Sequence, residues 1–430
     1  MLKVGNYRIH MISLFSFFLY IAMSDLFGLV DFSLFVPGEL YDFLVICLLL
    51  TTVIMTRKWR KDIPATFSLL WPFYALTAIG ILQGCLLYFT DVQSIGHSLS
   101  VIRELLFLVI IFPYLQLEYD PHKVIRIFVV LDTIAAIVYI TEIIYGGPVT
   151  GTVHALGIYE NMGGMKIWRS WSHSPLYITF TASYLFLHIL KGKKVFSTRA
   201  KDIMSFCLIV LAAIARLNRT ELFCVILSCI LSILIADGSN YKRKIIHAAG
   251  IAITAVLGGG LLFTIFPGVY RRMANGVADL VNFSNGLGST LSIRVFAFKT
   301  RMDYILSNGK ALFGVGPLHR DYRLPGLEVN IHDSANNRIL SSDNAYATFL
   351  IRYGVVGLAL FILGIVLLSR RFIGCRYIWA IPFGLSVFVT LINAYFGYEV
   401  WGKQGVLSIC ILAGIYLKIL QQEEFKGNKI

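Results

Sequence analysis

The residues best suited to bind a charged substrate are arginines at the ends of apolar segments. Arg216 and Arg219 lie close together in residues 216–221, between two apolar runs. A guanidinium near hydrocarbon is costly unless it reaches water, a carboxylate or a phosphate. Two interpretations stay open: the side chains extend to the membrane interface with Glu221 as a local partner, or they bind an anion, which we favour.

A second arginine group lies in residues 292–301, where mostly apolar residues separate Arg294 from Arg301. This spacing predicts an amphipathic helix along the membrane interface, ended by a turn at residues 314–317 (Gly-Val-Gly-Pro). The helix either presents a solvated charged face or binds a phosphate. We favour the phosphate, because guanidinium groups suit bidentate phosphate contacts.

A polar segment, residues 341–346, precedes a late apolar run and contains Asp343 and Asn344. Taken alone, an Asp-Asn pair before a helix is more often an N-cap than a catalyst. The functional alternative is that Asp343 accepts a proton from a nucleophilic hydroxyl or orients a cation. His332 and Asp333 are other candidate bases.

Residues 168–175 combine two tryptophans with Arg169 and His173 before another apolar run. These aromatics form either an interfacial belt or a sugar-stacking surface beside a basic group. The chain contains no nucleotide-binding, Walker, zinc-protease or serine-hydrolase motif in a suitable context. Its seven cysteines show no metal-ligand spacing, so we expect no metal site, no cofactor and no disulfide.

The elements that must position these residues are long apolar segments. The 430 residues are 57% hydrophobic and only 14% charged, which is typical of membrane proteins. Runs of about 20 apolar residues match the length that a helix needs to cross hydrocarbon. We therefore predict an all-α polytopic membrane protein with about twelve transmembrane helices. They are residues 10–29, 36–56, 65–88, 99–117, 124–145, 174–190, 202–217, 220–236, 245–267, 344–368, 376–394 and 404–420.

The basic residues predict the orientation of these helices. The short links rich in Lys and Arg are residues 57–61, 191–201, 241–244 and 370–371. By the positive-inside rule they mark the cytosolic face, so both termini are expected there and the net charge of +14 indicates a lipid bilayer rather than nucleic acid. Loops 146–173 and 268–343 then lie on the opposite face of a single membrane domain, residues 1–430. The longer loop is expected to fold into short amphipathic helices.

Several polar residues lie inside the apolar runs, where structural pairing with each other is the expected role. They are Asp25, Arg103, Glu104, Asp132 and Glu142.

The order and spacing of the four polar groups resemble the O-antigen polymerase and O-antigen ligase superfamily of bacterial surface-polysaccharide assembly. An Arg-led segment opens a middle span at residues 219–222, and an Arg-led helix closed by Phe-Gly-x-Gly follows at 294–316. A polar pair then opens a span with Gly-x-x-Gly at 343–357, and an Arg-x5-Pro segment matches at 169–175. The resemblance covers roughly residues 155–360.

The resemblance implies a metal-independent, lipid-linked glycosyltransferase in the bacterial cytoplasmic (inner) membrane, with its active face periplasmic or extracellular. Its donor is a glycan on undecaprenyl pyrophosphate, and an acceptor hydroxyl on a second lipid-linked repeat attacks the anomeric carbon. The flippase and chain-length regulator of the same pathway are expected partners. Ligases usually place a His before the Asn of the polar pair, where this chain has Asp343, so we favour a polymerase; a ligase and a flippase or transporter stay open as alternatives.

The same resemblance implies roles for individual residues. Arg219 and Arg294 would bind the pyrophosphate, and Asp343 would act as the base or orient the acceptor. The further expected substrate-binding residues are Arg216, Arg169, His173, Arg301, His332 and Asn344.

Overall fold

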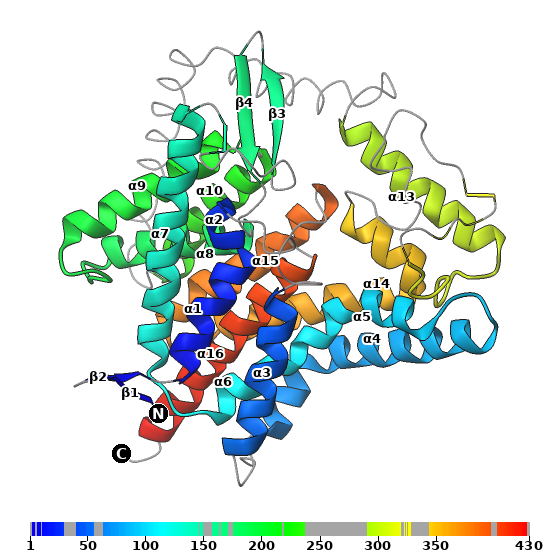
Figure 1. Ribbon diagram of the computed structural model, residues 1–430, viewed down its shortest axis with the longest axis horizontal. Helices are drawn as coiled ribbons and strands as arrows, with labels where there is room; N and C mark the ends of the chain where they lie inside the picture. Colours follow the sequence, from blue (N-terminus) through cyan, green and yellow to red (C-terminus); the bar gives the residue numbers. More distant parts are fainter. Residues whose placement is uncertain are drawn as a thin grey trace.

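The described part of the chain consists of helices and two small β-hairpins (Figure 1). The computed structural model describes residues 2–4, 7–9, 11–29, 40–55, 63–145, 147–148, 157–162, 165–170, 175–216, 219–236, 290–319, 322, 324, 326–327, 344–396 and 402–427. The helices are α1 (Met11–Met23), α2 (Asp25–Gly28), α3 (Leu40–Met55), α4 (Ile63–Phe89), α5 (Ile95–Leu106), η2 (Phe107–Ile110), α6 (Ile111–Gln116), α7 (Pro121–Tyr145), α8 (Pro175–Leu190), α9 (Arg199–Ala215), α10 (Arg219–Ala236), α13 (Thr290–Ser307), α14 (Ala345–Ile373), η4 (Ile378–Ala380), α15 (Ile381–Phe396) and α16 (Lys403–Gly427). The strands are β1 (Leu2–Val4), β2 (Tyr7–Ile9), β3 (Gly157–Met162) and β4 (Met165–Ser170).

The expected helical membrane architecture is confirmed in its coarse form. Among the described residues, six helical segments are long and apolar enough to cross a membrane: Ser68–Phe89, Ile95–Gln116, Pro121–Tyr145, Ala345–Ile373, Ile378–Tyr395 and Gln404–Glu423. Shorter apolar helices coincide with the expected runs near α1, α3, α8 and α10. The run 245–267 and most of loop 268–343 lie outside the described residues, so the count of twelve spans and the large external loop stay predictions.

A β-hairpin occupies part of loop 146–173, for which the sequence analysis predicted no particular secondary structure. Strands β3 and β4 pair antiparallel, with Tyr159 opposite Trp168 and Ile158 opposite Arg169. Aromatic and β-branched residues favour strands, and the two-glycine link between the strands suits a tight hairpin.

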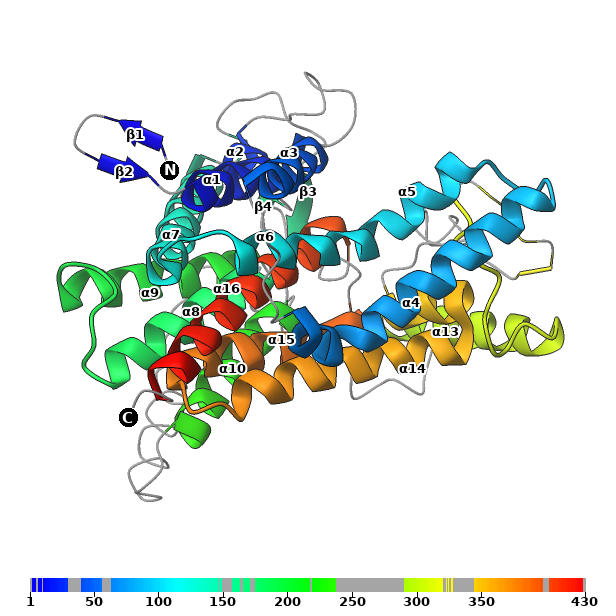
Figure 2. The same ribbon diagram turned by 90° about the horizontal axis from the view of Figure 1, so that it is seen from below.

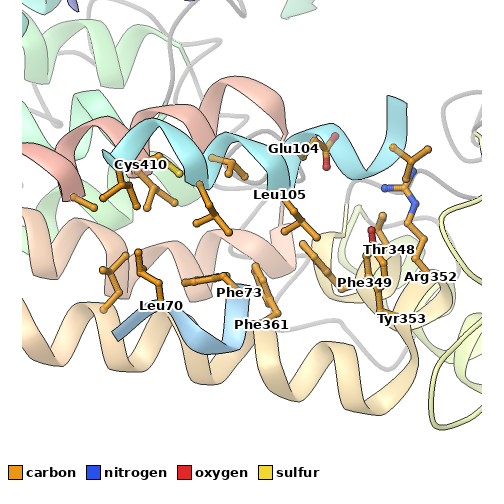
Figure 3. A pocket seen from close by; sticks show the side chains of 17 residues that line it. Leu70, Phe73, Glu104, Leu105, Thr348, Phe349, Arg352, Tyr353, Phe361 and Cys410 are labelled. Atoms are coloured by element: carbon orange, nitrogen blue, oxygen red, sulfur yellow. The ribbon is translucent and has the colours of Figure 1, made fainter. Parts of the chain in front are cut away.

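Helices α4 and α5 form an antiparallel pair that extends away from the remaining bundle together with α13 and α14 (Figure 2). Small residues permit the close approach of α14 to α4, since Gly357 lies against Leu76 and Gly364 against Phe73. Phe73 of α4 and Phe361 of α14 line the same side of a narrow cavity (Figure 3).

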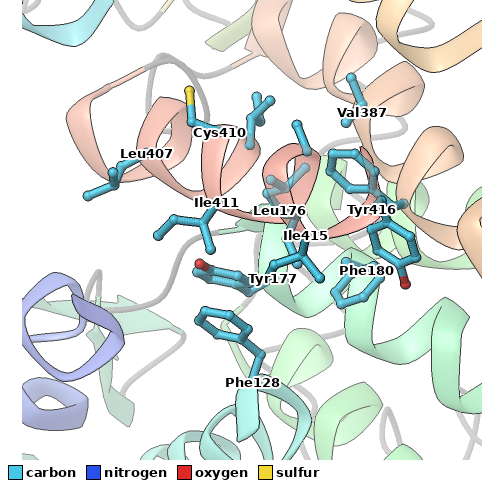
Figure 4. Packing of buried hydrophobic residues seen from close by; sticks show 14 of the residues in the cluster. Phe128, Leu176, Tyr177, Phe180, Val387, Leu407, Cys410, Ile411, Ile415 and Tyr416 are labelled. Atoms are coloured by element: carbon cyan, nitrogen blue, oxygen red, sulfur yellow. The ribbon is translucent and has the colours of Figure 1, made fainter. Parts of the chain in front are cut away.

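Helix α16 is the central element of the bundle. In its apolar window 89% of residues are buried, because apolar side chains surround the helix on all sides. Its side chains Ile411 and Ile415 pack beside Tyr177 of α8, and Tyr416 stacks on Phe383 of α15 with ring centroids 5.3 Å apart (Figure 4). Phe372, in the last turn of α14, also packs on Tyr416 with ring centroids 6.1 Å apart, so this core holds the ends of α14 and α15 that are opposite to the candidate site.

Candidate functional site

Helix α13 carries Arg294 and Arg301, as the sequence spacing predicted. Arg301 is 4% exposed and donates from Nη1 to the carbonyl oxygen of Ala297, one turn earlier, at 2.9 Å. Arg294 is half-buried, and α13 packs on α14 and α15. The helix therefore presents Arg294 toward its neighbours and holds the guanidinium of Arg301 against its own backbone.

Asn344 joins α13 to the start of α14. Its Oδ1 accepts a hydrogen bond from the backbone N–H of Ala347 at 3.2 Å, so Asn344 is the N-cap of α14. Its Nδ2 donates to the carbonyl oxygen of Arg294 at 3.4 Å, across 50 residues of sequence. One fully buried amide thus caps a helix and brings together two residues that the sequence placed in separate groups.

The end of α15 completes this region. The hydroxyl of Tyr346, in the first turn of α14, donates to the carbonyl oxygen of Leu391 at 2.5 Å. The charge of Arg294 acts on Tyr395, whose ring lies 6.4 Å from that of Tyr346. We define the α13–α15 site as Arg294, Asn344, Tyr346 and Tyr395.

Helix α10, which begins at Arg219, packs on the same helix α15. Cys224 contacts the carbonyl oxygen of Val389 through its Sγ at 3.5 Å. Arg219 precedes Cys224 by five residues, or about 8 Å of helix. Helix α15 is therefore the element shared by the Arg219 group and the α13–α15 site.

Helix α14 is broken at Gly354, which has φ 66° and ψ −166°. The sequence analysis predicted a span over 344–368, which Ala345–Ile373 matches, but it did not anticipate this break inside the span. Only glycine adopts this conformation readily, so Gly354 divides α14 into segments 345–353 and 355–373. The turn at residues 311–316 packs directly on the break.

A row of polar residues follows the first segment of α14. Asn344, Thr348 and Arg352 are spaced by four, which places them on one face of the helix. Thr348 donates from Oγ1 to the carbonyl oxygen of Asn344 at 3.2 Å. Thr348 and Arg352 were not singled out from the sequence, although polar residues spaced by four at the start of an apolar run were the available signal.

The far end of this row reaches a narrow cavity between α4, α5, α14 and α16 (Figure 3). Glu104, Thr348 and Arg352 line it together with apolar side chains such as Leu105 and Phe349. Its volume, about 30 Å³, is enough for water-sized molecules only. Glu104 was expected to pair with other polar residues inside the bundle, and the structure places it at this cavity.

A second polar cluster lies between α1, α7, α9 and α10. Arg216 is 4% exposed and forms a 3.0 Å ion pair with Glu221, which is fully buried. Its charge also acts on Asp132, which shares a small cavity with it. The local pairing with Glu221 that the sequence analysis considered for Arg216 is therefore present, and this guanidinium is directed into the protein.

Asp132 in this cluster accepts a hydrogen bond at Oδ1 from the hydroxyl of Tyr20 at 2.8 Å. The sequence analysis expected Asp132 to pair with another of the polar residues inside the apolar runs. Its hydrogen-bond partner is instead a tyrosine 112 residues earlier. Arg103 likewise pairs with Asp42 on α3 rather than with a residue of the expected set.

Tyr20→Phe is expected to destabilise the protein by about 1–3 kcal/mol, because Asp132 is only 2% exposed and loses a buried donor. Thermal unfolding of the detergent-solubilised chain measures the loss. Tyr88→Phe is the matched control, since Tyr88 is 49% exposed and should change stability by less than about 0.5 kcal/mol. Equal unfolding temperatures for Tyr20→Phe and the control would contradict this role of the bond.

Five of the expected site residues are placed only in part or not at all. Arg169 lies in β4 opposite Ile158 and Arg219 begins α10, but the side chains of both are not described. Asp343, His173 and His332 lie outside the described residues. Their expected roles as base and substrate-binding residues stay predictions.

No family model matches this chain, and a comparison with curated proteins found no match.

Proposed function

We propose that this chain is a polymerase that extends undecaprenyl-pyrophosphate-linked oligosaccharide repeats at the outer face of the bacterial cytoplasmic membrane. The observation that carries the proposal is the α13–α15 site, where the buried amide of Asn344 bonds to the backbone of Arg294. An arginine held at the meeting point of three helices is suited to stabilise an anionic leaving group. The order of the Arg-led and Gly-rich segments in the sequence supports the same interpretation.

In the proposed reaction, an acceptor hydroxyl of one lipid-linked repeat attacks the anomeric carbon of another. The new C–O glycosidic bond forms as the C–O bond to pyrophosphate breaks, and undecaprenyl pyrophosphate leaves with the bonding electron pair. Asp343, next to the cap residue Asn344, takes the hydroxyl proton. Arg294 and Arg219 stabilise the negative charge that develops on the pyrophosphate, and preorganised donors act strongly where water is scarce.

The remaining proposed substrate residues have different tasks. Arg169 and His173 would contact the glycan or pyrophosphate from loop 146–173, and His332 from loop 268–343. Arg301 bonds to a backbone carbonyl of its own helix, so its contribution is the positive potential it adds near the site. The charge of Arg216 is compensated by Glu221, so its contribution is to hold the start of α10, which carries Arg219. Both termini would be cytosolic, and the two loops would face the periplasm or cell exterior.

Glycan profiles of a strain that lacks this gene test the proposal. Single repeat units on the cell surface, with long chains restored by the wild-type gene, are the expected result. Full-length polymer retained on undecaprenyl pyrophosphate would instead indicate a ligase. Single repeats trapped in the cytosolic leaflet would indicate a flippase and contradict the mechanism.

A further inference from the structure

The break in α14 and the turn at residues 311–316 are joined by reciprocal backbone hydrogen bonds. Val315 and Gly316 donate to the carbonyl oxygens of Ile351 and Arg352, each at 2.9 Å. In return, Val355 and Val356 donate to Ala311 at 2.9 Å and to Leu312 at 3.1 Å. We call these two segments, 311–316 and 351–356, the backbone joint.

The joint supplies hydrogen-bond partners to backbone groups that the break in α14 leaves without helical partners. Interrupting a helix leaves N–H and C=O groups without helical partners, and such groups are costly away from water. The turn supplies donors and acceptors to the groups on either side of Gly354. The break therefore depends on a segment about forty residues earlier in the chain.

Two glycines make this contact possible. At Gly314 (φ 71°) a Cβ would lie 2.6 Å from the backbone of Arg352, and at Gly354 (φ 66°) it would overlap the carbonyl of Leu312. Gly309 also has a positive φ, 65°, but a Cβ there would meet no atom within 4 Å. Gly309 thus shares the positive φ of Gly314 without its close approach.

The other side of the turn is held by the α4–α5 pair. Gln83 donates from Nε2 to the carbonyl oxygen of Phe313 at 2.5 Å. Gln93 donates to the carbonyl of Pro317 at 2.8 Å and accepts from the N–H of His319 at 3.0 Å. The turn is consequently fixed between two glutamines and the break.

The break folds the first segment of α14 back on the second. Phe349 and Phe361 are twelve residues apart, yet their rings stack with centroids 4.1 Å apart. In an unbroken helix they would be about 18 Å apart along the axis. The fold-back is what carries Asn344, at the start of the first segment, to the backbone of Arg294.

We propose that the backbone joint is a positioning device for the α13–α15 site, with Gly314 and Gly354 as its positioning residues and Gln93 as a support. Its effect on turnover rests on the proposed function, whereas its effect on the geometry does not. If the hydrogen bonds of the joint do not form, the first segment of α14 no longer folds back on the second. Asn344 then loses its hydrogen bond to the backbone of Arg294. Misplacing a catalytic group by about 1 Å lowers the reaction rate roughly 100-fold. We therefore expect the joint to affect turnover more than substrate affinity.

The test compares Gly314→Ala with Gly309→Ala in the full-length chain, each in two formats. In a cysteine-free background, Phe349→Cys with Phe361→Cys reports the fold-back through a short thiol cross-linker. In proteoliposomes, extension of a lipid-linked repeat gives kcat and KM. For Gly314→Ala we expect loss of the cross-link and a fall in kcat of about 100-fold with a smaller change in KM, and for Gly309→Ala a retained cross-link and near wild-type turnover.

Gln93→Leu keeps the test decisive if Gly314→Ala does not fold, because it removes side-chain bonds to the turn without a backbone clash. We expect a weaker cross-link and a fall in kcat of about tenfold. A full cross-link and wild-type kcat in Gln93→Leu and in any folded Gly314→Ala would overturn the inference. If the wild-type chain extends no glycan but Gly314→Ala still loses the cross-link, the proposed function fails while the joint stands.

Discussion

Arg294→Ala is expected to lower the rate of glycan extension by about 10²–10³-fold, the usual effect of removing one preorganised donor to a developing negative charge. The protein should stay folded. The hydrogen bond from Asn344 goes to the backbone carbonyl of residue 294, which the substitution retains. Turnover of a lipid-linked repeat in proteoliposomes, with thermal unfolding of the same preparation, measures both effects.

Lys299→Ala is the matched control for this substitution. Lys299 lies on the same helix, is exposed, and carries the same charge. Removing it should leave the rate within a few fold of wild type. Arg294→Lys should restore only part of the activity, because lysine lacks the paired donors of a guanidinium. Full activity in Arg294→Ala would remove this residue from the mechanism.

Glu221→Ala is expected to destabilise the protein by about 3–5 kcal/mol. The substitution leaves the guanidinium of Arg216, only 4% exposed, without the carboxylate that contacts it at 3.0 Å. Removing one partner of a buried ion pair lowers stability by more than the intact pair contributes to it, because the remaining buried charge loses the opposite charge that compensated its desolvation. The measurement is the thermal unfolding temperature of the detergent-solubilised chain.

The double variant Glu221→Ala with Arg216→Met separates the pair from its members. Since both charges are then absent, most of the lost stability should return. A double variant no more stable than Glu221→Ala alone would contradict this explanation. So would wild-type unfolding of Glu221→Ala, because the carboxylate would then not compensate the buried arginine.

Hydropathy predicted the positions of the long helices well. The run expected at 124–145 is α7, Pro121–Tyr145, and the run at 404–420 lies within α16. These predictions succeed because a helix forms all its backbone hydrogen bonds internally. A sufficiently long run of apolar residues is then enough for it to cross the membrane. The runs at 202–217 and 220–236 correspond to the separate helices α9 and α10. The sequence left a tight hairpin or one broken helix open at residues 217–219, and residues 217–218 lie outside the described part of the chain.

The break at Gly354 was not predictable from hydropathy, because it lies inside an apolar run that continues on both sides despite Arg352. Gly354 by itself is an ordinary residue in a membrane helix. The break exists because the turn around Gly314 supplies its hydrogen bonds, and this partner is remote in sequence. The sequence analysis identified both glycine segments as parts of one family-like pattern but gave no reason for them to touch.

The site was likewise predicted in its residue types but not in its pairings. Arg294 and Asn344 were both named, whereas the bond between them and the position of Tyr395 beside them came only from the packing of α13, α14 and α15. The cap interpretation considered for the Asp343–Asn344 pair is confirmed at Asn344, whereas its expected contact with substrate stays a prediction. Pairings such as Tyr20 with Asp132 span 112 residues, a distance over which local sequence patterns carry no information.

The central claim is that this chain itself forms glycosidic bonds between lipid-linked repeats. The most direct measurement reconstitutes the purified wild-type chain in proteoliposomes with a single lipid-linked repeat as the only glycan, and follows the products by mass spectrometry. The account predicts products of two and more repeats on undecaprenyl pyrophosphate, with free undecaprenyl pyrophosphate released for each bond formed. Unextended repeat that merely moves from one leaflet to the other would contradict it.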